Sequence, residues 1–151
     1  MGQCDRLVKV CLLFFCNKVK GNFSMNVILS IKPKYAWAIL NGDKKVEFRK
    51  NTFKKDVQKV FIYSSSPDQK LIGYFSIKSI CVDSPKKLWK KYGKVGCIDR
   101  DDFFKYYTNK SAGTTFVIDK AVKFEKPISP REIFENFYPP QSFMYCEKEI
   151  A

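Results

Sequence analysis

The residues that could carry chemistry are concentrated in one short segment, NGDKKVEFRK, at residues 41–50. Within it, Lys44, Glu47 and Arg49 place one carboxylate between two cations. Neighbouring cations favour the ionised form of a glutamate, and the glutamate can orient an arginine toward a planar, bidentate partner. The charged residues also alternate with two apolar residues, as in a half-buried strand. On an exposed strand face such charges would contribute only on the order of a few tenths of a kcal/mol. The pattern alone is compatible with a built charged site and with a solvated strand.

A second basic segment, PKKLWKKYGK, holds five lysines and no acidic residue, and interleaves them with Trp89 and Tyr92. Lysines beside aromatic rings suit phosphate contact combined with base stacking, a combination that serves single-stranded nucleic acids. The alternative is an amphipathic helix that buries its aromatic side chains and leaves its lysines in water. The candidate phosphate-contacting residues are Lys86, Lys87, Lys90 and Lys91.

Three polar residues outside these segments are further candidates for a binding site. Ser65 lies in the turn YSSSPD, whose hydroxyls could bind an anion or satisfy the backbone of the turn. Gln141 follows two prolines in YPPQSFMY and could read a base edge, although such a rigid aromatic tail usually closes a core. Lys32 precedes the first predicted helix. All three matter only if the fold brings them to the charged segment.

The composition favours an anionic partner and excludes several catalytic chemistries. Twenty-eight Lys and Arg against fifteen Asp and Glu give a net charge of +13. Such an excess attracts phosphate polymers or anionic surfaces, although lysine-rich surfaces also serve solubility. The chain has no histidine, which excludes Ser-His and Cys-His nucleophile pairs and the commonest zinc and iron ligand sets. Its six cysteines form no C-x-x-C pair, as expected for reduced thiols in the cytoplasm. We expect neither a metal nor a cofactor.

The first 24 residues are expected to form an N-terminal extension outside the fold. Their apolar run, from Val8 to Cys16, is too short to span a bilayer, so we expect no stable membrane insertion. A short amphipathic appendage that packs on the domain or on a partner is the alternative. Met25 is a second possible start, and the patterned domain, residues 25–151, begins there.

The rest of the chain predicts short helices inserted between about five strands. Apolar runs and alternation predict strands at 27–31, from 44 onward, at 59–66, at 70–83 and at 114–128, the last being one long strand or a hairpin. Helix starts are predicted at Pro33, Pro85, Asp99 and Ser129, the last with a capping box. Gly73, inside a predicted strand, indicates a bulge or a close backbone approach. These elements predict an α+β fold, built as a small mixed or antiparallel β-barrel with short inserted helices.

Several of these segments resemble the ASCH domain family of the PUA-like superfamily. GDKKVEFRK matches the family's G-x-K-x-x-E-x-R signature through Gly42, Lys44, Glu47 and Arg49. The segments ILSIKPKYAWAILNG, VFIYSSSP, LIGYF and PPQSFMY also look like one bacterial and archaeal branch, so the likeness covers roughly residues 25–145. The resemblance implies a PUA-like β-barrel with a helix beside a cleft, signature residues lining that cleft, and binding of RNA or a nucleotide.

Two functional hypotheses follow from the residues and the resemblance together. In the first, the chain is a monomeric or weakly dimeric binding module for RNA, or for another nucleic acid or nucleotide, with Lys45 joining the signature residues at the cleft. In the second, it is a small hydrolase of modified cytidine or of RNA that uses Lys44 and Glu47 as its acid–base or nucleophilic pair. Relatives that remove an acyl group from modified cytidine keep the lysine but have threonine where this chain has Glu47. That departure removes the obvious nucleophile.

Overall fold

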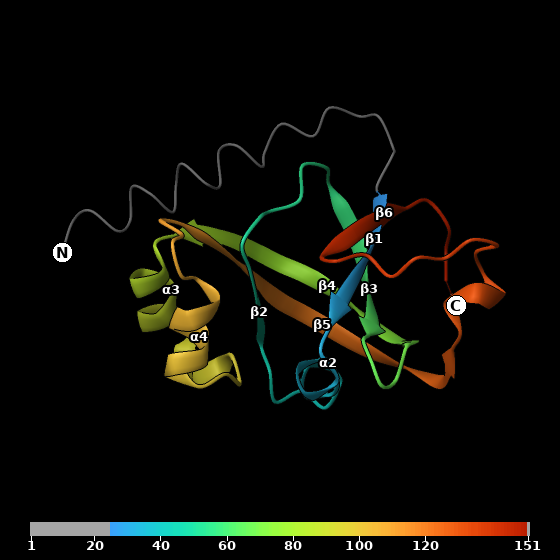
Figure 1. Cartoon of the computed structure of the whole chain (residues 1–151), viewed down its shortest axis with the longest axis horizontal. Coiled ribbons are helices and arrows are strands. Elements are labelled where there is room, and N and C mark those ends of the chain that lie inside the picture. Colours follow the sequence, from blue (N-terminus) through green and yellow to red (C-terminus); the bar gives the residue numbers. More distant parts are fainter. Residues whose placement is uncertain (1–24, 151) are drawn as a thin grey trace.

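The computed structural model of the chain describes residues 25–150, and the expected N-terminal extension lies outside them. Six strands form one sheet in the order β2-β5-β4-β3-β1-β6 (Figure 1). Their bounds are β1 Met25–Ile31, β2 Val46–Arg49, β3 Val57–Ser64, β4 Lys70–Asp83, β5 Gly113–Ile128 and β6 Phe143–Cys146. The β1–β3 pair is parallel and the other pairs are antiparallel. The fold is therefore mixed α+β, as expected, but hydrogen bonds between described strands do not close the sheet into the expected barrel.

The strand and the helix that begin the domain form where the sequence predicts them. β1 is a buried strand in which Val27, Ile28 and Leu29 have no exposed surface. Helix α2, Pro33–Leu40, begins with proline at its first position, where no backbone N–H is needed. It ends before Gly42, whose φ of 84° lies in the left-handed region that favours glycine. The chain then turns directly into β2, so α2 and the charged segment lie next to each other.

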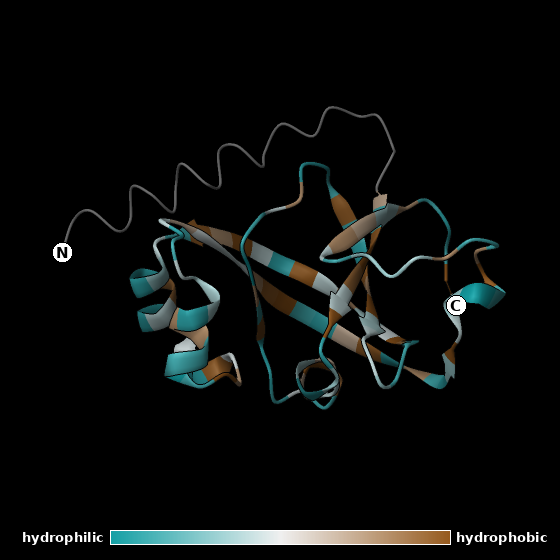
Figure 2. Cartoon of the chain, in the orientation of Figure 1, coloured by the Kyte–Doolittle hydropathy of each residue, from teal (hydrophilic) through white to brown (hydrophobic). Residues whose placement is uncertain are grey.

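The antiparallel pair β4–β5 contains the two longest strands of the sheet, with 14 and 16 residues. Residues 114–128, predicted as a long strand or a hairpin, thus belong to one strand. Hydrophobic and hydrophilic stretches follow one another along both strands (Figure 2). The register shifts between Leu71 and Gly73, and a Cβ on Gly73 would lie 2.3 Å from the Val122 carbonyl oxygen. The predicted close backbone approach at this glycine is therefore present.

A helical insertion connects β4 to β5 and packs at one end of the long strands (Figure 1). It comprises α3 Pro85–Tyr92, the 3₁₀ helix η1 Gly93–Val95 and α4 Arg100–Tyr106. Its core contains Leu88 and Phe103, which are buried together with Val46 and Phe48 of β2. The Phe48 and Phe103 rings meet edge to face, with centroids 4.8 Å apart. Because the apolar face of β2 is fixed against the insertion, its charged face turns the other way. None of the described helices is both long and apolar enough to span a bilayer.

The prediction of a helix from Ser129 onward is wrong. Only one 3₁₀ turn forms, η2 Pro130–Glu132, and the Ser129 side chain makes no capping hydrogen bond. The chain instead leads away from the end of β5 to place β6 against β1 at the far side of the sheet (Figure 1). Phe137 packs on Tyr63 on the way, with ring centroids 5.4 Å apart. Two prolines at 139–140 then prevent further helical hydrogen bonding.

Candidate functional site

A cleft of about 720 Å³ lies over the charged face of β2. Its lining comes from α2, β1, β2, the turn after β3, α4 and the segment before β6. Six residues singled out in the sequence line it: Lys32, Lys44, Glu47, Arg49, Ser65 and Gln141. The fold thus gathers residues from four separate stretches of the chain into one cavity.

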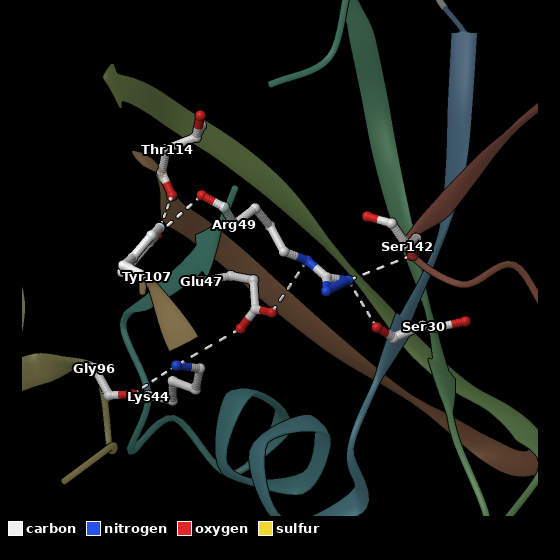
Figure 3. Close-up of polar contacts among 8 residues, drawn as sticks. All are labelled: Ser30, Lys44, Glu47, Arg49, Gly96, Tyr107, Thr114 and Ser142. Atoms are coloured by element: carbon white, nitrogen blue, oxygen red, sulfur yellow. Dashed lines mark hydrogen bonds and ion pairs between the residues drawn. The ribbon is translucent and has the colours of Figure 1, made fainter. Parts of the chain in front are cut away.

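Glu47 lies at the centre of a buried charged triad on the cleft floor (Figure 3). Lys44 Nζ is 3.6 Å from Glu47 Oε2, and Arg49 Nε is 3.5 Å from Glu47 Oε1. Lys44 and Glu47 expose only 3% and 6% of their surface. The alternation expected for β2 is present, but its charged face does not meet open solvent. An exposed ladder of charges is therefore the wrong description of this strand.

The two cations of the triad also hold distant backbone segments together. Lys44 Nζ donates a hydrogen bond of 2.5 Å to the Gly96 carbonyl, in the helical insertion. Arg49 Nη2 donates to the carbonyls of Ser30, at 2.7 Å, and Ser142, at 3.4 Å (Figure 3). Three segments that do not follow one another in the sequence are thereby fixed around Glu47.

The segment before β6 is held against β1 by a further pair of hydrogen bonds. Ser30 Oγ donates to the Pro140 carbonyl at 2.7 Å, and the Ser30 backbone N–H donates to the Ser142 carbonyl at 3.0 Å. These bonds place Pro140 and Gln141 on the cleft wall. The rigid tail predicted from the two prolines is thus also part of the candidate site.

Besides Tyr63 of β3, two tyrosines that sequence reasoning did not single out line the cleft, Tyr35 on α2 and Tyr106 on α4. Burial raises the pKa of both hydroxyls, so they stay protonated at neutral pH and can donate hydrogen bonds. The Tyr35 ring centroid is 5.2 Å from Lys44 Nζ. Each tyrosine fits the apolar pattern of its own helix, and only the placement of those helices beside β2 shows that the rings face a cavity.

Tyr107, the residue that follows α4, supports the backbone of β2. The Tyr107 hydroxyl is buried, which raises its pKa, and it donates a 2.9 Å hydrogen bond to the Arg49 carbonyl (Figure 3). It also reaches the Thr114 carbonyl of β5, at 3.4 Å. The backbone of Arg49 is thus anchored independently of its side chain.

The turn between β3 and β4 forms another part of the rim and is fixed by Asp68. Ser64 Oγ and Trp37 Nε1 donate to Asp68 Oδ2 at 2.7 and 2.9 Å. These two hydrogen bonds, the serine's first, lower the pKa of the Asp68 carboxyl. Because Trp37 belongs to α2, the turn that carries Ser65 and Gln69 into the cleft is tied to that helix. Ser64 therefore stabilises the turn through its hydrogen bond to Asp68, while Ser65 lines the cavity.

Several predicted binding residues lie outside the cleft. Gly42 and Lys45 belong to the turn before β2, where both are exposed. Lys86, Lys87, Lys90 and Lys91 are exposed on α3, and Lys87 pairs with Asp83 at 3.5 Å. Trp89 and Tyr92 of the same helix pack against the core of the insertion, as the amphipathic alternative expects. The lysines are therefore candidates for electrostatic contact, while the stacking role proposed for their aromatic neighbours is not supported.

No group of three or more Cys, Asp and Glu in the described part of the chain is arranged to hold a metal ion. The chemistry that these residues offer is that of the cleft itself. It combines an ionisable carboxylate, two fixed cations, protonated tyrosines and two amide side chains, Gln69 and Gln141.

The sequence and the fold are similar to those of known proteins. The family model of the ASCH domain matches residues 29–128, and the chain belongs to this family, within the PUA-like superfamily. An ASCH domain-containing ribonuclease of Zymomonas mobilis is 29% identical over 129 residues, which cover 81% of this chain and 84% of that protein. The crystal structure of the ASCH protein from Zymomonas mobilis superposes with a TM-score of 0.75 at 27% identity, covering 80% of this chain and 87% of that one.

A ribosomal protein of Ureaplasma parvum also contains a similar region. The large ribosomal subunit protein uL22 of that organism is 29% identical over 122 residues, which cover 80% of this chain but 39% of that protein. The similarity therefore concerns one part of a longer polypeptide.

The first prediction concerns the buried triad. Lys44→Ala removes one cation from a nearly buried ion pair and leaves the Gly96 carbonyl without its donor, so we expect the free energy of unfolding to fall by about 3 kcal/mol. Lys45→Ala, at the exposed neighbouring position, should change it by about 0.5 kcal/mol or less. Urea unfolding measures both. Equal losses in the two variants would contradict the structural role of Lys44.

The second prediction concerns Asp68 and pH. Its pKa is lower in the folded than in the unfolded chain, so its carboxylate stabilises the fold above the unfolded value of about 4, and this stabilisation is lost as the pH falls through the folded value. The stability difference between the wild type and Asp68→Asn should therefore be largest near pH 7 and shrink toward pH 3. Urea unfolding across this range measures it. Asp119→Asn, at an exposed position of β5, is the control and should show no such trend.

Proposed function

We propose that this ASCH domain binds nucleic acid, with single-stranded RNA as the ligand, in the cleft above the triad. The observation that carries the proposal is the triad itself: Glu47, nearly buried between Lys44 and Arg49, forms the floor of a cavity of nucleotide size. Tyr35 and Tyr106 add aromatic rings that can contact a base. The signature residues would then be binding residues, as the family resemblance implies.

RNA is favoured by the relatives and by the charge of the chain. A similar protein of about the same length is a ribonuclease by name, which indicates an RNA substrate for that protein. The net charge of +13 attracts a phosphate backbone. The exposed lysines of α3 lie on the insertion that supplies Gly96 to the triad and Ile98 to the cleft, so nucleotides beyond the cleft can follow this helix.

Arg49 also supports the PUA-like barrel that the family implies. Its guanidinium joins the edge strand β2 to β1 and to the segment that precedes the other edge strand, β6. The two edges of the open sheet are thus linked by side-chain to backbone hydrogen bonds where strand pairing does not link them. We propose that this linkage takes the place of strand-to-strand closure.

The third prediction concerns the contribution of α3. Replacing Lys86, Lys87, Lys90 and Lys91 with alanine should reduce the slope of log affinity against log salt by about 0.7 for each lysine that contacts a phosphate of single-stranded RNA. Fluorescence anisotropy with a labelled oligonucleotide, at salt concentrations from about 50 to about 300 mM, measures the slope.

A matched control separates the position of the charges from their number. Replacing four exposed lysines elsewhere, Lys55, Lys78, Lys120 and Lys126, removes the same charge. If both quadruple variants lose the same slope, the attraction is generic and α3 is not the backbone contact. If neither the wild type nor the variants bind RNA, the proposed function itself fails.

A second candidate function is RNA cleavage, which the ribonuclease relative favours. Glu47 faces the cleft and could take the proton of a ribose 2′-hydroxyl, whose oxygen then attacks the adjacent phosphorus. The 5′-oxygen leaves with a proton from Lys44, which gives a 2′,3′-cyclic phosphate and a 5′-hydroxyl. Arg49 would stabilise charge on the phosphate oxygens. Hydrolysis of acylated cytidine is less favoured, because Glu47 stands where that branch has threonine.

The fourth prediction tests cleavage. If Glu47 is the base, Glu47→Gln should lower the cleavage rate by about 100-fold or more, and the products of the wild type should end in 2′,3′-cyclic phosphate. Mass spectrometry of a defined oligonucleotide identifies the ends, and Glu135→Gln, at an exposed position prepared in parallel, controls for contaminating nucleases. Cleavage that persists in Glu47→Gln would exclude this mechanism and leave the binding function in place.

A further inference from the structure

The Glu47 carboxylate is nearly buried and yet accepts no hydrogen bond from any described residue. Its nearest cationic nitrogens, at 3.5 and 3.6 Å, are at ion-pair distances, and its side chain is 8% exposed. Arg49 Nε is likewise buried without a hydrogen-bond acceptor among residues 25–150. Buried carboxylates usually accept several hydrogen bonds, because losing those of water is costly. Both oxygens of Glu47 therefore keep acceptor capacity for a group in the cleft.

The two cations beside Glu47 are already engaged with the protein. Lys44 Nζ donates to the Gly96 carbonyl, and Arg49 Nη2 donates to the carbonyls of Ser30 and Ser142. The floor therefore has two kinds of unmet capacity: the Glu47 oxygens can accept hydrogen bonds, and Arg49 Nε can donate one. A phosphate oxygen is an acceptor only and carries the same sign of charge as Glu47, whereas the edge of a base carries donors beside an acceptor. The most deeply placed part of the ligand is consequently a base and not a phosphate.

The surroundings of Glu47 fit a planar ring with N–H groups on its edge. Tyr35 and Tyr106, from two different helices, line the cleft and offer aromatic surface for stacking. Gln69 and Gln141 lie in the same cavity and can donate and accept at the other edges of a base. An unstacked base of a single strand can enter such a cavity, whereas a base within a duplex cannot.

The donor pattern of the bases selects among them. Guanine presents N1–H and the 2-amino group side by side, which match the two oxygens of one carboxylate. Adenine and cytosine present one amino group next to an acceptor nitrogen, and uracil presents one N–H between two carbonyls, which repel a carboxylate. We infer that Glu47 is a specificity-determining residue that reads the Watson–Crick edge of an unstacked guanine. This inference rests on the proposed function, because it assumes that RNA enters the cleft.

The test compares pentanucleotide RNAs with a single variable base, UUGUU, UUIUU and UUUUU, bound to the full chain. Inosine differs from guanosine only by the 2-amino group. We expect guanosine to bind about tenfold more tightly than inosine, and uridine to bind most weakly. The Glu47→Gln variant replaces one acceptor oxygen by a donor, so its preference for guanosine over inosine should disappear. Glu135→Gln, at an exposed glutamate, should keep it.

The outcomes separate this inference from the proposed function. Equal, salt-sensitive binding of all three RNAs would overturn the guanine assignment and leave RNA binding intact. Binding of none of them would overturn both. A loss caused by 2′-deoxyguanosine at the variable position, with none caused by inosine, would place Glu47 against the ribose and overturn the assignment. The wild-type comparison needs no variant, so equal binding of guanosine and inosine overturns the inference even if Glu47→Gln fails to fold.

Discussion

The charged triad on β2 is the constraint around which the rest of the domain is arranged. Lys44 and Glu47 are held almost entirely out of water and the Arg49 side chain is 14% exposed, a placement that is tolerated only when each group finds partners. The two cations donate to the backbone carbonyls of Gly96, Ser30 and Ser142, which come from the helical insertion, from β1 and from the segment before β6. Glu47 has the two cations as its ion-pair partners. The three segments that these bonds fix contribute Ser30, Ile98 and Gln141 to the lining of the cleft.

Much of the scaffold was predictable because its signals are local. The bounds of β4 follow from apolar alternation, the start of α2 follows from Pro33, and the close approach at Gly73 follows from a glycine inside a strand. The helix expected after Ser129 shows the limit of such signals. A capping box favours a helix start, but the following chain must cross to β1, and that tertiary requirement overrides the local preference.

The site was predictable in its residue types and not in its environment. Alternation along β2 shows that the side chains of Glu47 and Val46 point to opposite faces of the strand, but it does not show what covers Glu47. The cover comes from segments far away in the sequence, so the choice between a solvated strand and a buried triad required the fold or the family resemblance. Tyr35 and Tyr106 were missed for the same reason, since each satisfies the pattern of its own helix. The lysines of α3, conversely, were grouped with the cleft by charge although the fold keeps them outside it.

The pairing of β6 with β1 has a consequence for the order in which the domain is completed during translation. β1 is among the first described residues to leave the ribosome and β6 among the last, and loop closure between them carries the entropic cost of a long intervening chain. Strands β1 to β5 and the triad can assemble earlier, with Ser30 already available to Arg49. Until residues 139–146 emerge, the nascent domain has a charged floor and a basic helix but lacks one wall of its cleft. The wall to which Pro140 and Gln141 belong is thus the last part of the candidate site to be made.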